Sequence, residues 1–326
     1  MHGFDFSAAT SVEDAVDRAV DGSAYLAGGT TLVDLMKLDV MTPEHVIDIN
    51  ALPMRGISGG RQGLRIGALE RMSDVAAHRD VAVGYPVIAR ALVQSASPQL
   101  RNMASIGGNL LQRTRCDYFR DVHSPCNKRQ PGTGCPAQNG ENRGHAILGT
   151  SASCAATHAS DLAVALVALD ASVRLHSRNG DRLVLLADLY RLPGDTPDME
   201  NQLQPGELIT EVLVPALPWS RHSTYVKVRD RRSYEFALAS AAVALNVRGH
   251  RIRDARVAVG GVGTVPWRLP AVERALSGKP PVLASFEAAA RSAVDGARPL
   301  ARNGFKVTLV QRTIVRALVE LAGSDD

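Results

Sequence analysis

The four cysteines of this 326-residue chain constrain its fold more than any other feature, because all of them lie within one stretch of 39 residues, at Cys116, Cys126, Cys135 and Cys154. Thiols that only fill a hydrophobic core would be scattered along the chain. The nine, eight and eighteen residues between them lack the C-x2-4-C pairs of most structural zinc sites. Long loops supply the four thiolates of a [4Fe–4S] cluster at irregular spacing. The cysteines therefore favour such a cluster, with zinc, two disulfides or unrelated thiols as alternatives.

The residues around the cysteines predict a loop that wraps around a centre. Cys126 follows Pro125, and Cys135 stands in the run Pro-Gly-Thr-Gly-Cys-Pro at 131–136. Proline and glycine favour turns, and turns direct peptide N–H groups toward sulfur acceptors. Residues 113–143 hold six Arg or Lys and three Asp or Glu. This positive excess either offsets the charge of a thiolate cluster or forms an ordinary solvated loop surface.

Composition excludes several classes of protein. The length predicts about two domains, and 45% apolar with 21% charged residues is typical of a soluble globular chain. No apolar run approaches the ~20 residues of a membrane span. The net charge of +4 is scattered and aromatic residues are only 4%, so no nucleic-acid interface is expected. The first residues resemble no export signal.

Apolar periodicity and turn residues predict a mixed chain of helices and strands. The expected helices cover 11–20, with Ser11 as N-cap, and 86–96, 161–170 and 307–321, and a further helix is expected to open at 32–36 after the Gly28-Gly29 turn. The expected strands cover 25–27, 45–49, 64–68, 173–176, 184–186 and 208–214. A proline-containing linker at 215–218 precedes a second unit, whose strands at 225–228, 241–247 and 255–259 are expected to be antiparallel.

Two glycine turns carry the signal for an anion site. Gly28-Gly29-Thr30-Thr31 follows an expected strand. Ser105-Ile106-Gly107-Gly108-Asn109 stands before the segment that carries the cysteines, residues 112–154, here called the cysteine segment. Such turns present backbone N–H groups to phosphate oxygens, and glycine permits close approach. Two of them with flanking hydroxyls predict a pyrophosphate bound from both sides. The P-loop pattern and the G-x-G-x-x-G fingerprint are both absent.

Four segments in this order identify a family resemblance: Leu-Ala-Gly-Gly-Thr-Thr-Leu at 26–32, Ala-Ser-Ile-Gly-Gly-Asn-Leu at 104–110, Ala-Ser-Asp-Leu at 159–162, and Gly-Glu-Leu-Ile-Thr at 206–210. The chain resembles the FAD-binding medium subunits of the molybdenum hydroxylases, the xanthine dehydrogenase family, over nearly its whole length. In most of that family the second and third segments lie close together. Here 52 positions separate Asn109 from Asp161, and the insertion carries the cysteines.

The resemblance implies an α+β fold. A two-lobed, PCMH/VAO-like FAD-binding domain would occupy residues 1–218, and a smaller α+β domain with an antiparallel sheet and helices would occupy 219–326. Residues 112–154 would be an inserted [4Fe–4S] loop with Cys116, Cys126, Cys135 and Cys154 as ligands. This insertion is similar to that of the FAD subunit of a bacterial periplasmic aldehyde oxidoreductase, and more loosely to hydroxybenzoyl-CoA reductase.

The resemblance also implies how FAD is bound. On one side of its pyrophosphate it places Leu26, Ala27, Gly28, Gly29, Thr30, Thr31 and Leu32. On the other side it places Ser105, Gly107, Gly108 and Asn109. Asp161 would accept a hydrogen bond from a flavin hydroxyl, or act as the N-cap of the next helix. Ile209 would pack near the isoalloxazine. Lys227 would lie near the flavin, or else be a surface lysine.

The function implied by the resemblance is electron transfer in a heterotrimer. A molybdopterin-binding large subunit would oxidise an aldehyde or related substrate, and a small subunit would hold two [2Fe–2S] clusters. This chain would pass electrons to an external acceptor without catalytic residues of its own. The alternatives are a stand-alone FAD oxidoreductase of the same fold, a hydroxybenzoyl-CoA reductase-like subunit, and a zinc-stabilised binding module. Cytoplasmic assembly is expected, with co-export to the periplasm beside a signal-bearing partner as the alternative.

Overall fold

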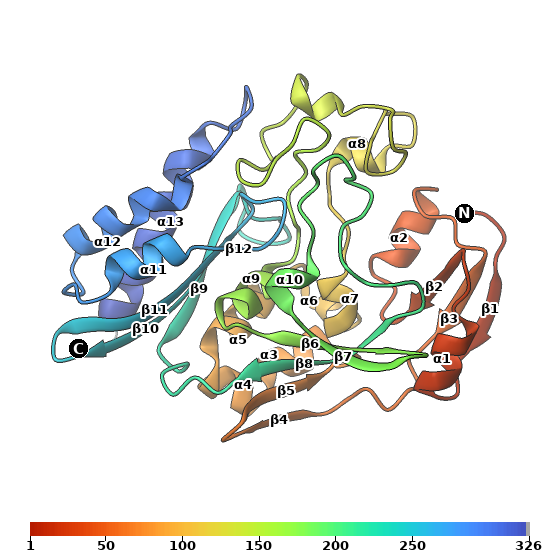
Figure 1. Cartoon of the computed structure of the whole chain (residues 1–326), viewed down its shortest axis with the longest axis horizontal. Helices are drawn as coiled ribbons and strands as arrows, with labels where there is room; N and C mark the ends of the chain where they lie inside the picture. The colour runs from red at the N-terminus through yellow and green to blue at the C-terminus, as the bar shows by residue number, and fades with distance from the viewer. Residues whose placement is uncertain (324–326) are drawn as a thin grey trace.

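Three β-sheets organise the chain, whose residues 1–323 are described by a computed structural model (Figure 1). The first sheet is parallel, in the order β1-β3-β2, with β1 (Asp5–Ala8), β2 (Ser23–Leu26) and β3 (His45–Asp48). The second is antiparallel, in the order β4-β5-β8-β6-β7, with β4 (Ile57–Gly60), β5 (Gly63–Gly67), β6 (Ser172–Ser177), β7 (Gly180–Leu185) and β8 (Leu208–Pro215). The third is also antiparallel, in the order β12-β11-β10-β9, with β9 (Ser223–Val228), β10 (Ala239–Arg248), β11 (Arg251–Gly260) and β12 (Trp267–Arg268).

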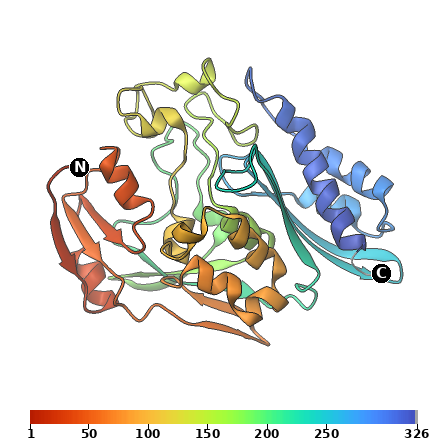
Figure 2. The ribbon, with the colours of Figure 1, turned by 180° about the vertical axis from the view of Figure 1, so that it is seen from behind.

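Helices cover these sheets and fill the space between them. Those of the first part are α1 (Val12–Arg18), α2 (Leu32–Lys37), α3 (Met72–Ala77), α4 (Arg79–Gly84), α5 (Pro86–Gln94), α6 (Pro98–Arg101), α7 (Ile106–Leu110), α8 (Asp117–Arg120), α9 (Asp161–Ala168) and α10 (Leu186–Leu189). Those of the last part are α11 (Pro270–Leu276), α12 (Leu283–Ala290) and α13 (Phe305–Ala322), and short 3-10 turns occur at Pro136–Gln138 and Arg291–Val294. Helices α11 to α13 lie together on the outer face of the third sheet (Figures 1 and 2).

Helix α9 joins the two larger sheets into one body. All eight of its residues are buried, since it packs against α5 on one side and against β10 and β11 on the other. The core around α9 accordingly includes Tyr225, Ala242 and Ala258 from the third sheet. A second core lies between that sheet and α11 to α13. This packing creates the junction at which the cavity described below is found.

The structure confirms the predicted α+β class and most of the expected elements. Ser11 caps α1 by accepting a hydrogen bond from the backbone N–H of Asp14. The strands of the second unit are antiparallel, as predicted. Strand β1 was not expected, because its only partner is β3, forty residues further along the chain. The division at residue 218 stays a prediction.

Candidate functional site

The two glycine turns lie in direct contact. A Cβ atom on Gly28 would stand 1.9 Å from the carbonyl oxygen of Met103 and 2.7 Å from its carbonyl carbon, so only glycine fits. Met103 comes just before Ser105, where the second turn begins. Segments 75 positions apart in the sequence are therefore placed side by side, as the predicted pyrophosphate site requires.

The first turn keeps its backbone donors free. Gly29 has a φ of +70°, which turns the chain from β2 into α2. The N–H groups of residues 28–32 donate to no acceptor within residues 1–323, and the hydroxyl of Thr31 makes no capping bond. Successive unpaired N–H groups at the start of a helix attract anions. This turn fits one side of the predicted pyrophosphate site.

The backbone N–H groups of the second turn already have acceptors within the protein. Ser105 caps α7 by accepting from the N–H of Gly108 at 3.2 Å. The N–H groups of Ile106 and Gly107 donate to carbonyls of residues 68–70, and that of Asn109 donates to Ser105. The backbone N–H groups of residues 106–109 all have acceptors within the protein, so the two turns differ in their free donors, and the binding of the pyrophosphate by residues 105–109 stays a prediction. Gly108 and Asn109 contribute to the cavity as wall residues.

A cavity of about 900 Å³ opens between the turns, the cysteine segment and the third sheet. It is lined by six of the residues predicted to bind FAD: Thr30, Thr31, Gly108, Asn109, Asp161 and Lys227. The other residues predicted to bind the pyrophosphate do not line the cavity: Leu26, Ala27, Gly28, Gly29, Leu32, Ser105 and Gly107. Ile209 is also absent from the wall, because it lies buried in β8 opposite Leu175 in the core.

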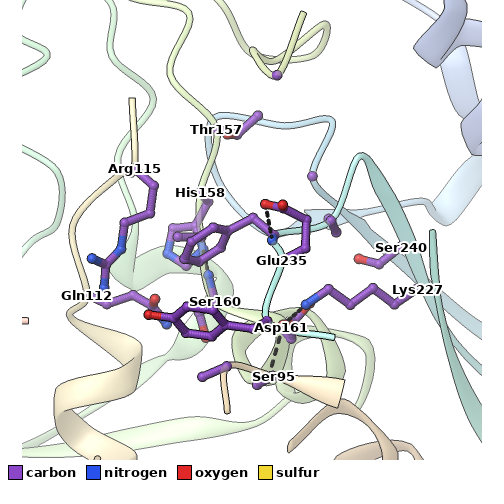
Figure 3. A pocket seen from close by; sticks show the side chains of 18 of the residues that line it. Ser95, Gln112, Arg115, Thr157, His158, Ser160, Asp161, Lys227, Glu235 and Ser240 are labelled. Carbon is purple, nitrogen blue, oxygen red and sulfur yellow. Dashed lines mark hydrogen bonds and ion pairs between the residues drawn. The ribbon is translucent and has the colours of Figure 1, made fainter. Parts of the chain in front are cut away.

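Asp161 is the centre of a buried polar network on the cavity wall (Figure 3). Its carboxylate is 7% exposed and accepts from Tyr225 Oη at 2.7 Å, Lys227 Nζ at 2.8 Å and Ser95 Oγ at 3.0 Å. The Lys227 side chain is 1% exposed, so the surface-lysine alternative is wrong. The N-cap of α9 is Ser160, not Asp161.

Electrostatics keep this network in one charge state. Burial and the neighbouring Asp161 carboxylate hold the pKa of Tyr225 well above its usual value, so Tyr225 stays a neutral donor. A carboxylate has about four acceptor positions, and three hydrogen bonds leave room for one more donor. The predicted bond from a flavin hydroxyl to Asp161 is thus chemically compatible and stays a prediction.

The cysteines converge although no disulfide joins them. All four are free, and all four line one small cavity of about 10 Å³ together with His145. The Sγ atom of Cys116 lies 3.3 Å from His145 Nε2, and Cys154 Sγ accepts from the N–H of Ala156 at 3.4 Å. Burial raises the pKa of Cys116 to about 12. Among residues 1–323, no group of three or more His, Cys, Asp or Glu is arranged to hold a single metal ion.

Ion pairs anchor the cysteine segment to remote parts of the chain. Arg115 and Arg120 both donate to Asp34 on α2, at 2.9 and 2.8 Å. Glu200 in turn pairs with two further cations of the segment, Arg113 at 2.5 Å and Lys128 at 2.9 Å. These four cations are therefore not a free solvated surface, whereas their offset of the charge of a thiolate cluster stays a prediction.

The cysteine cavity and the large cavity share a wall. Among residues 1–323, only Cys116 and His145 line both of them. Asn303 donates to the His145 carbonyl at 3.2 Å, and Lys306 Nζ donates to the carbonyl of Gly144 at 2.8 Å. Lys306 in α13 and Asn303 just before that helix thus hold residues 144–145 beside the large cavity.

Comparison with known proteins identifies the family. The model of the FAD binding domain in molybdopterin dehydrogenase matches residues 2–217, and that of the CO dehydrogenase flavoprotein C-terminal domain matches residues 224–321. The chain belongs to the FAD-binding medium subunits of the molybdenum hydroxylases. This molybdenum hydroxylase subunit is a flavoprotein and part of an oxidoreductase, as the resemblance implied.

Individual relatives agree with the family. The aldehyde oxidoreductase FAD-binding subunit PaoB of Escherichia coli (strain K12) is 48% identical over 303 residues, which cover 92% of each chain. The glyceraldehyde dehydrogenase medium chain of Sulfolobus acidocaldarius is 30% identical, covering 85% of this subunit and 82% of the relative. The carbon monoxide dehydrogenase of Hydrogenophaga pseudoflava that lacks the Mo-pyranopterin moiety superposes with a TM-score of 0.76 at 26% identity, covering 99% and 98% of the two chains.

Several wall residues of this FAD-binding subunit were not found from its sequence. Asp34, Arg115 and His158 all line the large cavity. Burial lowers the pKa of His158 to about 4, so its neutral ring accepts from the N–H of Ser160 at 3.3 Å. The one sequence signal for Arg115 is its position next to Cys116.

No helix in the described part of the chain is long and apolar enough to cross a bilayer.

Proposed function

We propose that the chain is the FAD- and [4Fe–4S]-binding electron-transfer subunit of a molybdenum-dependent aldehyde oxidoreductase. One observation carries this proposal: Thr30 and Thr31, whose N–H groups have no acceptor within residues 1–323, line a large cavity that shares a wall with the converging cysteines. The 48% identity to an aldehyde oxidoreductase FAD-binding subunit supports the aldehyde class of substrate.

The residues around the large cavity suit a flavin dinucleotide. The first turn supplies N–H groups and the hydroxyls of Thr30 and Thr31 for the diphosphate. Gly108 also lines the cavity, and the buried Asp161–Lys227 pair supplies polar groups on its wall. When bound, FAD supplies redox chemistry in one-electron and two-electron steps. The chain itself binds, orients and shields the cofactor.

The converging thiols suit an iron–sulfur cluster. Four cysteines and no carboxylate line the small cavity, and such soft donors favour iron–sulfur clusters or zinc. Backbone N–H groups also approach the sulfurs of Cys116, Cys135 and Cys154, as is usual around such clusters. When bound, the cluster supplies one-electron redox chemistry or braces the segment.

The proposed partners are a molybdopterin-binding large subunit and a small subunit with two [2Fe–2S] clusters. In that complex the chain accepts electrons from the partners' Mo and [2Fe–2S] centres and delivers them to an external acceptor. Assembly is proposed to occur in the cytoplasm, with co-export to the periplasm beside a signal-bearing partner as the alternative. Fractionation of the native host distinguishes the two compartments.

Purification from the native host under anaerobic conditions tests the proposal. The expected complex contains three different chains, one FAD and four irons per copy of this chain beyond those of the small subunit, and molybdenum in the large subunit. A single flavin-containing chain without molybdenum would instead indicate a stand-alone FAD oxidoreductase. A colourless chain that contains zinc and takes up no FAD would overturn the proposal altogether.

A further inference from the structure

Arg115 presents an unused hydrogen-bonding edge at the flavin cavity. It directly precedes Cys116 and lines the large cavity, on the opposite side from Lys227 in Figure 3. Its Nη1 atom donates to Asp34 Oδ2 at 2.9 Å. Its Nε atom is buried and has no hydrogen-bond partner, and its Nη2 atom donates to no acceptor within residues 1–323.

The unused edge has a specific chemical meaning. In a guanidinium group, the Nε–H and one Nη–H point in parallel and bind a phosphate or carboxylate by two hydrogen bonds. A buried donor without an acceptor is costly, and most such groups in proteins have a partner. Asp34 occupies only the other terminal nitrogen. No described residue supplies an anion to the Nε–Nη2 edge. This edge is therefore available to a bound anion.

The local charge balance points the same way. Asp34 carries one negative charge and pairs with both Arg115 and Arg120, so this group holds one excess positive charge. Asp34 stands on α2, within one turn of Thr30 and Thr31 in the first glycine turn. On the rest of the cavity wall, the cations Lys227, Arg143 and Arg231 are neutralised by Asp161, Asp230 and Glu235. Asp117 and Glu141 add negative charge to the same wall. The excess charge thus lies beside the free N–H groups of residues 28–32.

We propose that Arg115 is a binding residue for the diphosphate of FAD, and that Asp34 positions it. This inference rests on the proposed function, because it assumes that FAD occupies the large cavity. The Phe236 ring, whose centroid lies 5.5 Å from Arg115 Cζ, packs on the guanidinium face and leaves its edge available. The cysteine segment then has a second role, since it supplies a cation that the first turn itself lacks.

Ligand titrations of the full-length chain, purified with its partners and stripped of flavin, test the proposal. Arg115→Gln is expected to raise the Kd for FAD and for ADP by roughly 10- to 100-fold, the usual range for hydrogen bonds to a charged group. The Kd for riboflavin, which has no phosphate, is expected to stay within about twofold. Arg115→Lys keeps the charge but loses the two parallel N–H groups of the guanidinium, so the Kd for FAD and ADP is expected to rise by an intermediate factor.

Arg113→Gln is the matched control. It removes a cation from the same segment, but Arg113 pairs with Glu200 and does not line the large cavity. Its Kd for FAD is expected to stay near that of the wild type. If Arg115→Gln fails to fold, Arg115→Lys still decides the question. Wild-type affinity for FAD and ADP in the folded Arg115 variant would overturn the role of Arg115, whereas a wild-type chain unable to bind FAD would overturn the proposed function instead.

Discussion

Gly28 lies so close to the backbone of Met103 that a methyl group on its Cα would stand 1.9 Å from the Met103 carbonyl oxygen. This contact joins the first glycine turn, whose N–H groups have no acceptor within residues 1–323, to the start of the second turn, whose N–H groups have acceptors. It brings together two segments that lie 75 positions apart in the sequence, on either side of helices α3 to α6 in the chain.

Gly28→Ala should separate the two turns. Because the obstacle is backbone, the new methyl group cannot be accommodated by a side-chain rotation, and we expect a loss of about 1–3 kcal/mol in the free energy of unfolding. FAD content should fall with it. Urea denaturation and flavin absorbance measure the two effects. Gly84→Ala is the control, since a Cβ at that position meets nothing within 4 Å. Equal stability and FAD content in both variants would contradict this account of Gly28.

Gly108→Val should act differently. Gly108 lines the cavity, and a Cβ there would stand 2.9 Å from the capping hydroxyl of Ser105, which must shift. The valine side chain is expected to occupy ligand space, so FAD affinity should fall at least tenfold, whereas the disturbed cap should cost the flavin-free chain only about 1 kcal/mol in its free energy of unfolding. Fluorescence titration and thermal denaturation measure this difference. A valine variant that retains its full complement of flavin would show that Gly108 does not face the dinucleotide.

Cys126→Ser should lose iron. The substitution removes one of four thiols around the small cavity and leaves a hydroxyl, which is a poorer ligand for iron. Metal analysis of the anaerobically purified complex should show loss of the four irons assigned to this chain. Ser124→Ala, two positions away, keeps every thiol and should retain them. An unchanged iron content in Cys126→Ser would refute the ligand assignment.

Lys227→Met should leave the Asp161 carboxylate buried without its cation. Loss of one partner of a buried ion pair typically costs 3–5 kcal/mol, so chemical denaturation should show a large destabilisation. Asp161→Asn combined with Lys227→Met removes both charges and should recover a substantial part of that loss. If the double variant is no more stable than the single one, the pair does not act as a unit.

Lys306 should make stability depend on pH. It is fully buried, its Nζ donates to the carbonyls of Gly144 and Gly261, and burial lowers its pKa to about 7. The unfolded chain keeps this proton up to about 10.4, so between pH 7 and 10 the unfolded state binds more protons. Raising the pH over this range therefore favours the folded state, by up to about 1.4 kcal/mol per pH unit from this group.

Lys306→Met tests that slope. Methionine has no proton to release, so the difference in unfolding free energy between wild type and variant should grow in favour of the wild type as the pH rises from 7 to 10. Denaturation curves at several pH values measure it. A constant difference over the whole range would mean that Lys306 keeps its proton in the folded protein.

What the sequence determined by itself was local or compositional. The clustering of the cysteines, the cap at Ser11 and the strand-turn-helix around Gly28 depend on residues that are neighbours in the chain, and there the expectation and the structure agree. The tertiary structure decided which of the two similar glycine turns keeps N–H groups available to a ligand. Ser105 to Asn109 has the same Gly-Gly pattern as the first turn, but segment 68–70 supplies acceptors for its N–H groups.

The tertiary structure also decided the partners of the charged residues. The pairs of Asp34 with Arg115 and of Asp161 with Lys227, like the burial of Lys306, join segments that are remote in the chain. No local pattern encodes these pairs, because each forms only after the packing of α9 and the sheets brings its members within a few ångströms. Short-range preferences determine the elements, whereas their packing determines which side chains face the cavity.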